Sequence, residues 1–448
     1  STRKESSAAS DVYKRQVGLV SFDIQYKSDY VRKSVHDCHF IPSEDSRSYS
    51  ALHADGSHSG QRSIASFSLS EQKQCLFFPT VKDGFSGQVV VNTMNHRKES
   101  FDTEYDAKAT LDAARHSTIH VQAVHPEDNM GTNLADELTP LNYYTILSDE
   151  EPASVYTNAN LRSFYITQPL QINMENDSLH MRFYSPVGIK EVTVMAKSPT
   201  MDEYVEFVYI DDIPAFADIK TSIKVLEKGL YRTESGKVLQ FSAEEMNPAS
   251  LSLKIACNDP YWTKISQIKA KWYIKFVLNG GNPVTGTPNK NWWGIRPVHC
   301  REAVALFLNI GYMCTLEKFQ QRVSTFQGTF LDNNRYPVDT STLISRLENL
   351  SGFDIGLIYS GNGVSGLGGG RTWGVYQKSF LYHYENSGGC CSTIFHELGH
   401  CLGYNHNSTM TYGQWASGCA DVFYKNNIKD FPVNSHTILK SRSNPNIY

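Results

Sequence analysis

The sequence predicts a multidomain protein in which β-rich N-terminal domains precede a C-terminal α/β (α+β) domain. The chain has 448 residues with 40% hydrophobic content, enough for several domains that each have a core. Short segments of alternating apolar and polar residues, separated by turn residues, lie within the first 260 positions. Beyond about Asp259, segments with helical apolar spacing alternate with short apolar strands.

The first 150 residues divide into a polar segment and a β-rich domain. Residues 1–16 are rich in Ser, Ala, Lys and Arg, and we expect a disordered leader or an extraneous segment. Residues 17–150 contain short β runs, such as 87–91, among Ser, Asp and Gly, which is typical of a β-rich accessory domain. The polar stretch 128–158, which contains two prolines, is expected to be a linker.

Residues 151–260 are predicted to form a second β domain. Their apolar and polar residues alternate with a period of two, and Ser-Pro and Ser-Gly pairs interrupt the pattern. The expected strands are residues 180–184, 189–195, 204–210 and 237–241. Regular short strands with such turns are typical of an immunoglobulin-like sandwich, an architecture that does not by itself define a function.

Residues 261–448 are predicted to form the α/β domain. The expected strands are residues 271–278 and 353–359. The expected helices are residues 301–313, 316–326, 340–350 and 390–402, with one closing helix after residue 414. Asp339 or Ser341 is available to cap the third of these helices.

A glycine-rich hexapeptide, residues 361–366, follows the second expected strand and matches G-x-G-x-x-G. This pattern binds a dinucleotide only where a helix begins within it and directs its amides at the pyrophosphate. Three consecutive glycines at 368–370 disfavour such a helix. We therefore interpret the glycines as a mobile loop that leads into an extended segment, residues 371–384, with a plain surface loop as the alternative.

The strongest signal for chemistry is the run His-Glu-Leu-Gly-His-Cys-Leu-Gly-Tyr-Asn-His at residues 396–406. Positions four apart lie on one face of a helix, so His396 and His400 can direct their imidazoles at one ion. Gly403 can adopt a positive φ and is predicted to end the helix, which allows His406 to approach. Three neutral imidazoles with one open position form the ligand set of a catalytic zinc.

The pattern H-E-x-x-H-x-x-G-x-x-H, followed by a methionine-containing turn, resembles the metzincin zinc endopeptidases, which include astacins, serralysins, reprolysins and matrix metalloproteinases. The resemblance implies one catalytic Zn²⁺ and Glu397 as the general base. The implied zinc ligands are His396, His400 and His406. Met410 is the implied Met-turn residue, and Tyr412 is a candidate stabiliser of the oxyanion, with a packed aromatic side chain as the alternative.

The same resemblance implies a mixed sheet whose edge strand lies antiparallel to the substrate backbone. The residues that it assigns to this strand are Gly369, Gly370, Arg371, Thr372, Trp373 and Gly374. Addition of the substrate as a strand gives affinity with little demand on its sequence. The implied partner is a protein or peptide substrate, glycosylated or not, and the implied reaction is zinc-dependent hydrolysis.

Composition limits the other partners and leaves the cysteines open. A net charge of −4 without a long basic run argues against a nucleic-acid partner, and the longest apolar run, residues 303–308, is too short to span a bilayer. Nine cysteines leave at least one thiol unpaired within the chain. In an exported protein the nearest candidate pairs are Cys300 with Cys314, or two of Cys390, Cys391, Cys401 and Cys419. The resemblance implies an extracytoplasmic protein, secreted or at the cell surface, whose export signal is not in this sequence.

Two other functions are considered beside a peptidase. The β-rich domains are compatible with a surface adhesin or glycan-binding protein in which the metal domain is subordinate or inactive. The presence of Glu397 does not support an inactive site, because loss of this carboxylate would be its expected mark. Metal-dependent hydrolysis of a non-peptide bond is the third hypothesis.

Overall fold

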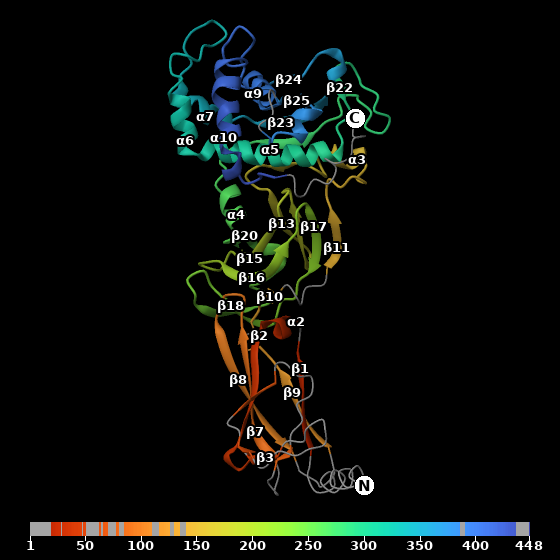
Figure 1. The fold of residues 1–448 in the computed structure, drawn as a ribbon, viewed down its shortest axis with the longest axis vertical. Helices are drawn as coiled ribbons and strands as arrows, with labels where there is room; N and C mark the ends of the chain where they lie inside the picture. Colours follow the sequence, from red (N-terminus) through yellow and green to blue (C-terminus); the bar gives the residue numbers. More distant parts are fainter. Residues whose placement is uncertain are drawn as a thin grey trace, which may run out of the picture. The chain divides into compact units, whose positions relative to one another are not determined.

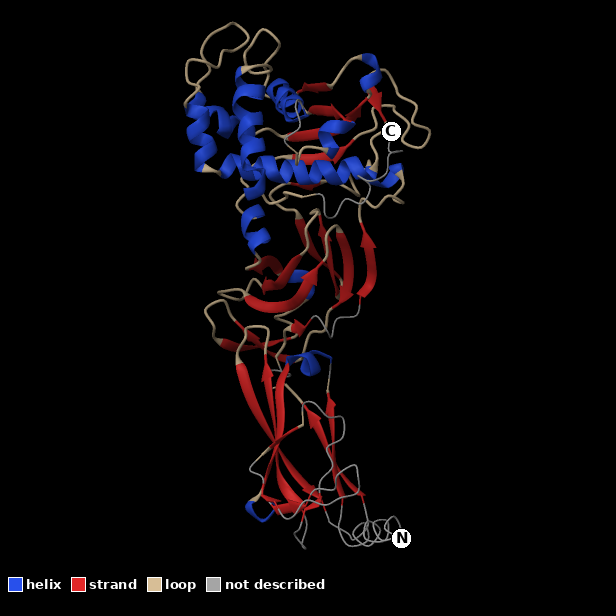
Figure 2. Ribbon diagram, viewed as in Figure 1, coloured by secondary structure: helices blue, strands red, loops and turns tan. Residues whose placement is uncertain are grey.

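The computed structural model describes residues 19–27, 29–46, 48–50, 62–63, 66–69, 78–79, 85–109, 116–125, 130–134, 140–385, 390–435 and 448. The chain forms two compact units, Ser1–Leu138 with Val225–Glu245, and Thr139–Lys224 with Met246–Tyr448. Both units contain β-sheets, and within the described residues the helices longer than six residues belong to the second unit (Figures 1 and 2). The predicted β-rich multidomain architecture is thus confirmed, whereas the boundaries after residues 16, 150 and 260 stay predictions.

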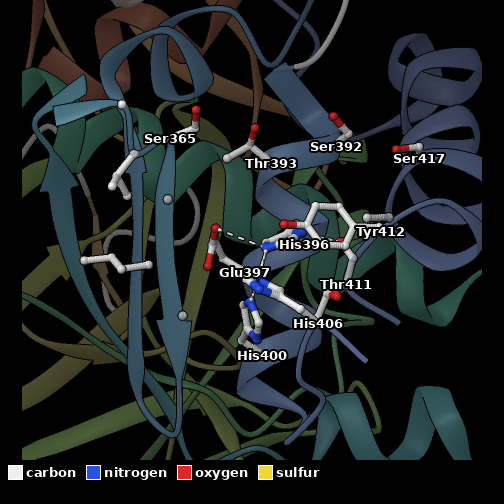
Figure 3. A pocket seen from close by; sticks show the side chains of 16 residues that line it. Ser365, Ser392, Thr393, His396, Glu397, His400, His406, Thr411, Tyr412 and Ser417 are labelled. Atoms are coloured by element: carbon white, nitrogen blue, oxygen red, sulfur yellow. Dashed lines mark hydrogen bonds and ion pairs between the residues drawn. The ribbon is translucent and has the colours of Figure 1, made fainter. Parts of the chain in front are cut away.

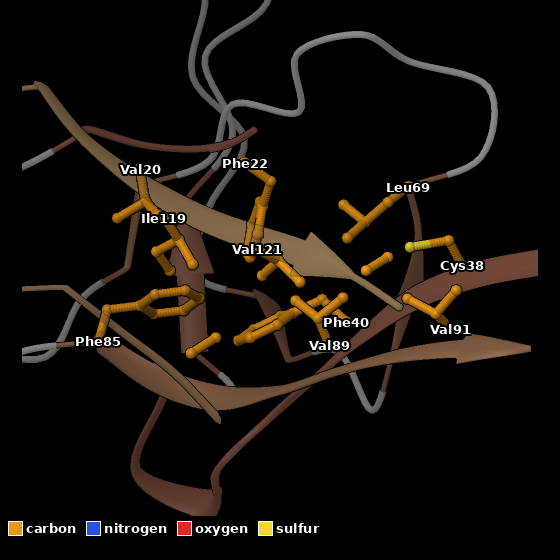
Figure 4. Close-up of a cluster of buried hydrophobic side chains, with 12 residues drawn as sticks. Val20, Phe22, Cys38, Phe40, Leu69, Phe85, Val89, Val91, Ile119 and Val121 are labelled. Carbon is orange, nitrogen blue, oxygen red and sulfur yellow. The ribbon is translucent and has the colours of Figure 1, made fainter. Parts of the chain in front are cut away.

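The first unit is a set of β-sheets around a hydrophobic core. Its largest sheet has the strand order β5–β2–β7–β8, and β1 pairs with β9 in parallel. The strands of these two sheets are β1 (Leu19–Tyr26), β2 (Val35–Pro42), β5 (Phe67–Ser68), β7 (Phe85–Met94), β8 (Ser100–Ala109) and β9 (His116–Ala123). A third, smaller sheet contains β3 (Ser48–Ser50), β4 (Arg62–Ser63) and β6 (Phe78–Pro79). In the core, the Phe40 ring lies 4.9 Å from that of Phe22 and 5.0 Å from that of Phe85 (Figure 4). The hairpin of β18 (Lys228–Arg232) and β19 (Val238–Ser242) also belongs to this unit.

The second unit begins with two antiparallel sheets. One has the order β11 (Pro140–Thr145), β17 (Ala217–Ser222), β14 (Ser178–Phe183) and β13 (Leu170–Glu175), and the other contains β16 (Val205–Ile213), β15 (Ile189–Lys197) and β20 (Ser252–Cys257). Leu179, Met181 and Phe183 of β14 are buried, while the residues between them are partly exposed, as the period of two predicted. The prediction of a linker over residues 128–158 is wrong for residues 140–145, which pair with β17 as a strand.

The second unit also contains a mixed sheet with the strand order β12–β21–β23–β25–β24. Its strands are β12 (Phe164–Tyr165), β21 (Tyr273–Phe276), β23 (Gly352–Ile358), β25 (Thr372–Tyr376) and β24 (Gly366–Gly369), and β22 (Trp292–Trp293) also pairs with β23. The three central strands are parallel, whereas β12 and β24 are antiparallel to their neighbours. The edge strand β24 is the part of this sheet that borders the site described below.

The second unit also contains helices, some of which pack on this sheet (Figure 2). They are α3 (Ala153–Tyr156), α4 (Pro260–Ile265), α5 (Pro297–Thr315), α6 (Glu317–Ser324), α7 (Thr340–Glu348), α8 (Gln377–Leu381), α9 (Cys390–Cys401), the π-helix η5 (Gln414–Asp421) and α10 (Val422–Asn427). Phe307 of α5 packs its ring 4.8 Å from Phe353 of β23 and 4.9 Å from Trp373 of β25. The Trp373 indole also donates to the carbonyl of Ile394, so α5 and α9 lie on the same face of the sheet.

The predicted helices and strands of residues 261–448 are confirmed, with one difference, which lies within residues 371–384. Asp339 caps α7 by accepting from the Ser341 amide, one of the two caps considered. No helix begins in residues 361–366; a 3₁₀ turn (Ser360–Asn362) is followed by β24, which removes the structural basis of a dinucleotide fingerprint. The prediction of an extended segment over residues 371–384 is wrong for residues 377–381, which form α8.

Candidate metal centre

Helix α9 carries the first two candidate ligands, His396 and His400, one turn apart. The helix ends as predicted at Gly403. Its φ is +93°, a backbone conformation that glycine adopts at little cost in free energy because it has no Cβ atom. The Gly403 amide donates to the carbonyl of His400, and the Tyr404 amide donates to that of Gly399. This C-terminal turn redirects the chain, so that residues 404–406 return toward the face with the two histidines.

A distant loop holds the returning segment in place. The Asn333 side chain donates its amide to the Gly403 carbonyl at 3.0 Å and accepts from the Asn405 amide at 2.7 Å. The Arg335 guanidinium donates to the Asn407 carbonyl at 3.1 Å. These bonds fix the backbone on both sides of His406, although nothing in the sequence around residue 333 predicts this role.

The three histidines meet at one point. The Nε2 atom of His400 lies 3.1 Å from Nε2 of His396 and 3.1 Å from Nε2 of His406, and the third Nε2–Nε2 distance is 3.3 Å. A point about 1.8 Å from all three nitrogens therefore exists, and an ion at the Zn–N distance of about 2.0–2.1 Å fits just to one side of their plane. The three imidazole nitrogens and their spacing thus fit a zinc ion that is open on one side. Within the described residues, these three histidines are the group whose ligand atoms lie close enough together to hold a metal ion.

Hydrogen bonds orient the rings. Nδ1 of His396 donates to the carbonyl of Thr411, and Nδ1 of His400 donates to the carbonyl of Tyr404 at 2.7 Å. A proton on Nδ1 leaves the lone pair on Nε2, which is the arrangement of metal-binding imidazoles. Burial, together with the neighbouring imidazoles, lowers the pKa of His396 to about 4, and burial also lowers the pKa of His400. Both rings are therefore neutral at pH 7, and each can offer its Nε2 lone pair to a cation.

Glu397 lies beside the three histidines in a narrow slot. Its side chain is 4% exposed, and Oε1 lies 3.9 Å from Nε2 of His396. A Cβ atom on Gly366 would lie 2.2 Å from Oε1 of Glu397, and one on Gly368 would lie 2.5 Å from its backbone carbonyl oxygen. Two glycines on one face of β24 thus make room for the carboxyl group. Burial raises the pKa of Glu397 to about 8.

The turn after His406 packs directly on α9. Met410 is fully buried, and its carbonyl oxygen lies against Gly399, where a Cβ would be 2.3 Å away. Tyr412 is 56% exposed, and its ring centroid lies 4.5 Å from that of His396 and 5.1 Å from that of His406. The tyrosine therefore lies at the rim of the metal centre and is not packed in the core.

Two buried indoles hold the first half of α9 from different sides. Trp373 donates its N–H to the carbonyl of Ile394 at 3.4 Å, and Trp415 donates to the carbonyl of Phe395 at 3.1 Å. Both side chains are fully buried, and a buried indole N–H needs such an acceptor. These bonds place the helix turn that precedes His396 and Glu397.

A cavity of about 510 Å³ opens beside the three histidines (Figure 3). Its lining residues are Gly363, Val364, Ser365, Gly366, Leu367, Gly368, Ser392, Thr393, His396, Glu397, His400, His406, Thr411, Tyr412, Ala416 and Ser417. All five predicted catalytic and metal-binding side chains border this one space. The hydroxyl side chains were not singled out in the sequence, since they are common residues without a recognisable spacing.

The six residues assigned to substrate binding lie elsewhere in the sheet. Thr372, Trp373 and Gly374 belong to β25, between β23 and β24, and the latter two are buried. Gly369 ends β24, and Gly370 and Arg371 form the turn between the two strands. None of the six borders the cavity, which is lined by residues 363–368 instead. The role of the six residues stays a prediction, and among the described strands β24 is the end strand of the sheet that borders the cavity.

All eight cysteines in the described part of the chain carry free thiols. Cys300 and Cys314 both lie within α5, which keeps them apart. Burial raises the pKa of Cys401 and Cys419 to about 12, so these thiols are protonated at neutral pH. Cys75 lies outside the described residues. Within those residues, no helix combines the length and apolar character needed to span a bilayer.

The chain was compared with known proteins. No known protein family's profile matches it, and no curated protein sequence is significantly similar to it. The assignment of a function therefore depends on the site itself: three imidazoles, a buried carboxyl group beside them, and an open cavity.

Proposed function

We propose that this chain is a zinc-dependent endopeptidase of the metzincin type. The observation that carries the proposal is the convergence of His396, His400 and His406 on one point, with Glu397 beside the open side. The motif at 396–406, the methionine-containing turn against Gly399 and the antiparallel edge strand over α9 support the same assignment.

The proposed reaction is hydrolysis of a peptide bond, in which a C–O bond forms and the C–N bond breaks. When bound, a zinc ion in this site supplies a Lewis acid that polarises a carbonyl and acidifies water. Glu397 accepts a proton at Oε1 and later donates it to the departing amine. The Tyr412 hydroxyl, at the rim, donates a hydrogen bond to the negative charge that develops on the carbonyl oxygen.

The substrate backbone is proposed to bind along the unpaired edge of β24. Among the described strands, β24 pairs with β25 alone, and it borders the cavity with Gly366, Leu367 and Gly368. Backbone hydrogen bonds to an added strand hold a peptide without selecting its sequence. A protein or peptide is accordingly the proposed partner, and an extracytoplasmic location, implied by the resemblance alone, belongs to the same proposal.

Two substitutions test the proposal by separating chemistry from metal binding. Glu397→Gln is expected to keep stoichiometric zinc and to lower casein or gelatin cleavage by a factor of about 10² or more, because the amide cannot accept the proton. His406→Ala is expected to lower zinc occupancy, because two imidazoles remain. Zinc is measured by elemental analysis and cleavage with and without a chelator. Wild-type cleavage by the Glu397→Gln protein would contradict the proposal.

The adhesin hypothesis makes the opposite prediction. If the β-rich unit carries the function and the metal centre is subordinate, a chelator leaves ligand binding unchanged and no protein substrate is cleaved. The buried carboxyl beside three convergent imidazoles favours the peptidase, because hydrolysis needs a proton acceptor at this place and a purely structural metal site does not.

A further inference from the structure

Tyr448 is held by side chains that lie far from it in the sequence. Its ring stacks on that of Trp293 in β22, with centroids 4.0 Å apart and an angle of 11° between the planes. The Arg296 guanidinium lies over the same ring, 4.0 Å from its centroid. Two stacked groups at this distance cannot share one face of a ring, so the phenol lies between the indole and the guanidinium.

Hydrogen bonds contact both ends of the tyrosine. Its hydroxyl donates to the Gly294 carbonyl at 2.6 Å, and the Gln377 side-chain amide donates to the Tyr448 backbone carbonyl at 2.9 Å. Burial raises the pKa of Tyr448, although the Arg296 guanidinium opposes this effect, so the hydroxyl keeps its proton at neutral pH. A phenylalanine could stack in the same place but would leave the Gly294 carbonyl without this donor.

The three side chains that surround Tyr448 are each fixed by a hydrogen bond to another residue. The bonds join the Trp293 indole to the Gly286 carbonyl (2.7 Å), the Arg296 guanidinium to the Pro283 carbonyl (3.0 Å) and the Gln377 side chain to His299 (2.9 Å). None of these three bonds involves Tyr448, so they also orient the side chains when the tyrosine is absent. A site whose walls are already ordered loses little conformational entropy when a ligand binds.

We propose that Trp293, Arg296 and Gln377 form a binding site for a tyrosine side chain, in which Tyr448 is a ligand supplied by the same chain. This tyrosine site accepts a tyrosine from another peptide once Tyr448 is removed. None of its three side chains lines the cavity beside the histidines, and the inference does not depend on the proposed function.

The attachment of Tyr448 to the same chain makes it a strong competitor for its own site. The chain is also fixed at Val433, whose amide donates to the Asn309 side chain and whose carbonyl accepts from it. A ligand tethered by so short a connection has an effective concentration on the order of millimolar. A free tyrosine derivative makes only the few contacts described above, so its expected Kd is also on the order of millimolar.

The test measures binding of N-acetyl-L-tyrosinamide to the full-length protein by ligand-detected NMR titration. Tyr448→Ala is expected to bind this ligand at least about five-fold more tightly than the wild type, because its tyrosine site is empty. Tyr336→Ala is the matched control, since it removes a tyrosine that is 68% exposed, and it should bind as the wild type does. Equal affinities of all three proteins, or no binding by Tyr448→Ala, would overturn the inference.

A second ligand tests the contribution of the hydroxyl. N-acetyl-L-phenylalaninamide is expected to bind Tyr448→Ala about five-fold more weakly than the tyrosine derivative, the ratio that one net hydrogen bond provides. Equal affinities for the two ligands would contradict the assigned bond to Gly294. Binding in the cavity beside the histidines would be the same in all of these proteins, so differences between them report on the tyrosine site.

Two further variants locate the site. Tyr448→Ala/Trp293→Leu is expected to bind the tyrosine derivative at least about ten-fold more weakly than Tyr448→Ala, because the stacking surface is lost, and denaturant unfolding checks that it is folded. Tyr448→Phe keeps the stacked ring and loses one hydrogen bond, so its affinity for the ligand should lie between those of the wild type and Tyr448→Ala. Unchanged binding by the double variant, or equal binding by Tyr448→Phe and Tyr448→Ala, would refute the assignment.

Discussion

A single absent side chain decides how closely the turn after His406 approaches α9. Gly399 is the third residue after His396, and a Cβ there would lie 2.3 Å from the Met410 carbonyl oxygen and 3.5 Å from the Thr411 Cα. Both are backbone atoms, which cannot rotate away as a side chain would. The Thr411 carbonyl accepts from His396, so a shift of this turn also moves the first ligand.

Gly399→Ala is therefore expected to lower stability by about 1–3 kcal/mol, the usual range for overpacking, and to weaken zinc binding. The measurements are denaturant unfolding and competition for zinc with a chromophoric chelator. Gly328→Ala is the control, because Gly328 has a φ of +81° but no atom within 4 Å of the added Cβ. It should cost about 1 kcal/mol and leave zinc affinity unchanged. Equal zinc affinities for both variants would refute the packing argument.

At the scale of elements, the loop between α6 and α7 acts on the metal centre without contributing a ligand. Asn333 makes two hydrogen bonds to the backbone on either side of Tyr404, and His406 follows two residues later. Residues that orient metal ligands indirectly commonly change metal affinity by about 10–100-fold when substituted. Asn333 acts through the backbone, so the lower end of this range applies.

Asn333→Ala is expected to weaken zinc binding about ten-fold while the ligands stay intact. Its exposed neighbour provides the control: Asn334→Ala removes a similar side chain that has no role in the turn. Zinc affinity is measured by chelator competition at fixed pH. A ten-fold loss in both variants, or in neither, would show that the Asn333 bonds do not position His406.

The start of α5 contains a histidine that resists protonation. His299 is fully buried; its Nδ1 accepts from the Arg296 amide at 3.1 Å, and its Nε2 donates to Gln377 at 2.9 Å. Burial lowers the pKa of His299 to about 4. Between pH 6.5 and 4 the unfolded chain binds this proton and the folded chain does not, so stability is lost as pH falls through this window.

The loss attributable to His299 is about 3 kcal/mol between pH 6.5 and pH 4. His299→Gln cannot titrate but can still accept from the helix N-terminus, so its unfolding free energy should fall less steeply with acid. Denaturant unfolding of both zinc-free proteins from pH 4.5 to 7.5 gives the difference, because other titrating groups are common to them. Parallel curves would contradict the assigned pKa shift.

At the scale of the whole molecule, the mixed sheet and helix α5 are joined to segments well before residue 261. Strand β12 extends the mixed sheet by pairing Phe164 with Ile274. Arg301 of α5, which is buried, donates to the Leu147 carbonyl and to Asp149. Tyr156 donates to the carbonyl of Ile295 at 2.8 Å. The segment from residue 146 to 166 thus satisfies polar groups of the α/β part of the second unit.

Residues 261–448 expressed alone are therefore expected to be less stable, because the buried Arg301 guanidinium loses its bonds to Leu147 and Asp149, and a buried polar group that loses hydrogen-bond partners costs about 1–3 kcal/mol. Residues 139–448 retain these partners and are expected to unfold cooperatively and to bind zinc. Calorimetry and zinc analysis compare the two fragments. Equal thermal stability and zinc content would show that residues 146–166 are dispensable.

Much of the second unit could be predicted because its signals are local. The helical spacing of α5 to α7, the strand β23 and the i, i+4 pair on α9 depend on residues within a few turns of one another. The prediction of α8 as extended failed because Trp373 and Phe380 are consistent with either structure in a short apolar run. The linker prediction failed at β11, an edge strand whose large side chains Leu141, Tyr143 and Tyr144 are exposed, so no buried apolar face marks this strand in the sequence.

The sequence by itself determined the three imidazoles, the neighbouring carboxylate and the glycine that ends α9, because all of them lie within eleven residues. Over such a short span, helix periodicity and the conformational freedom of glycine decide where the side chains point. Tertiary structure alone decided which strand borders Glu397, which loop holds His406 and which hydroxyls share its cavity. These relations join segments up to about seventy residues apart, and such distances are set by packing and not by local conformational preference.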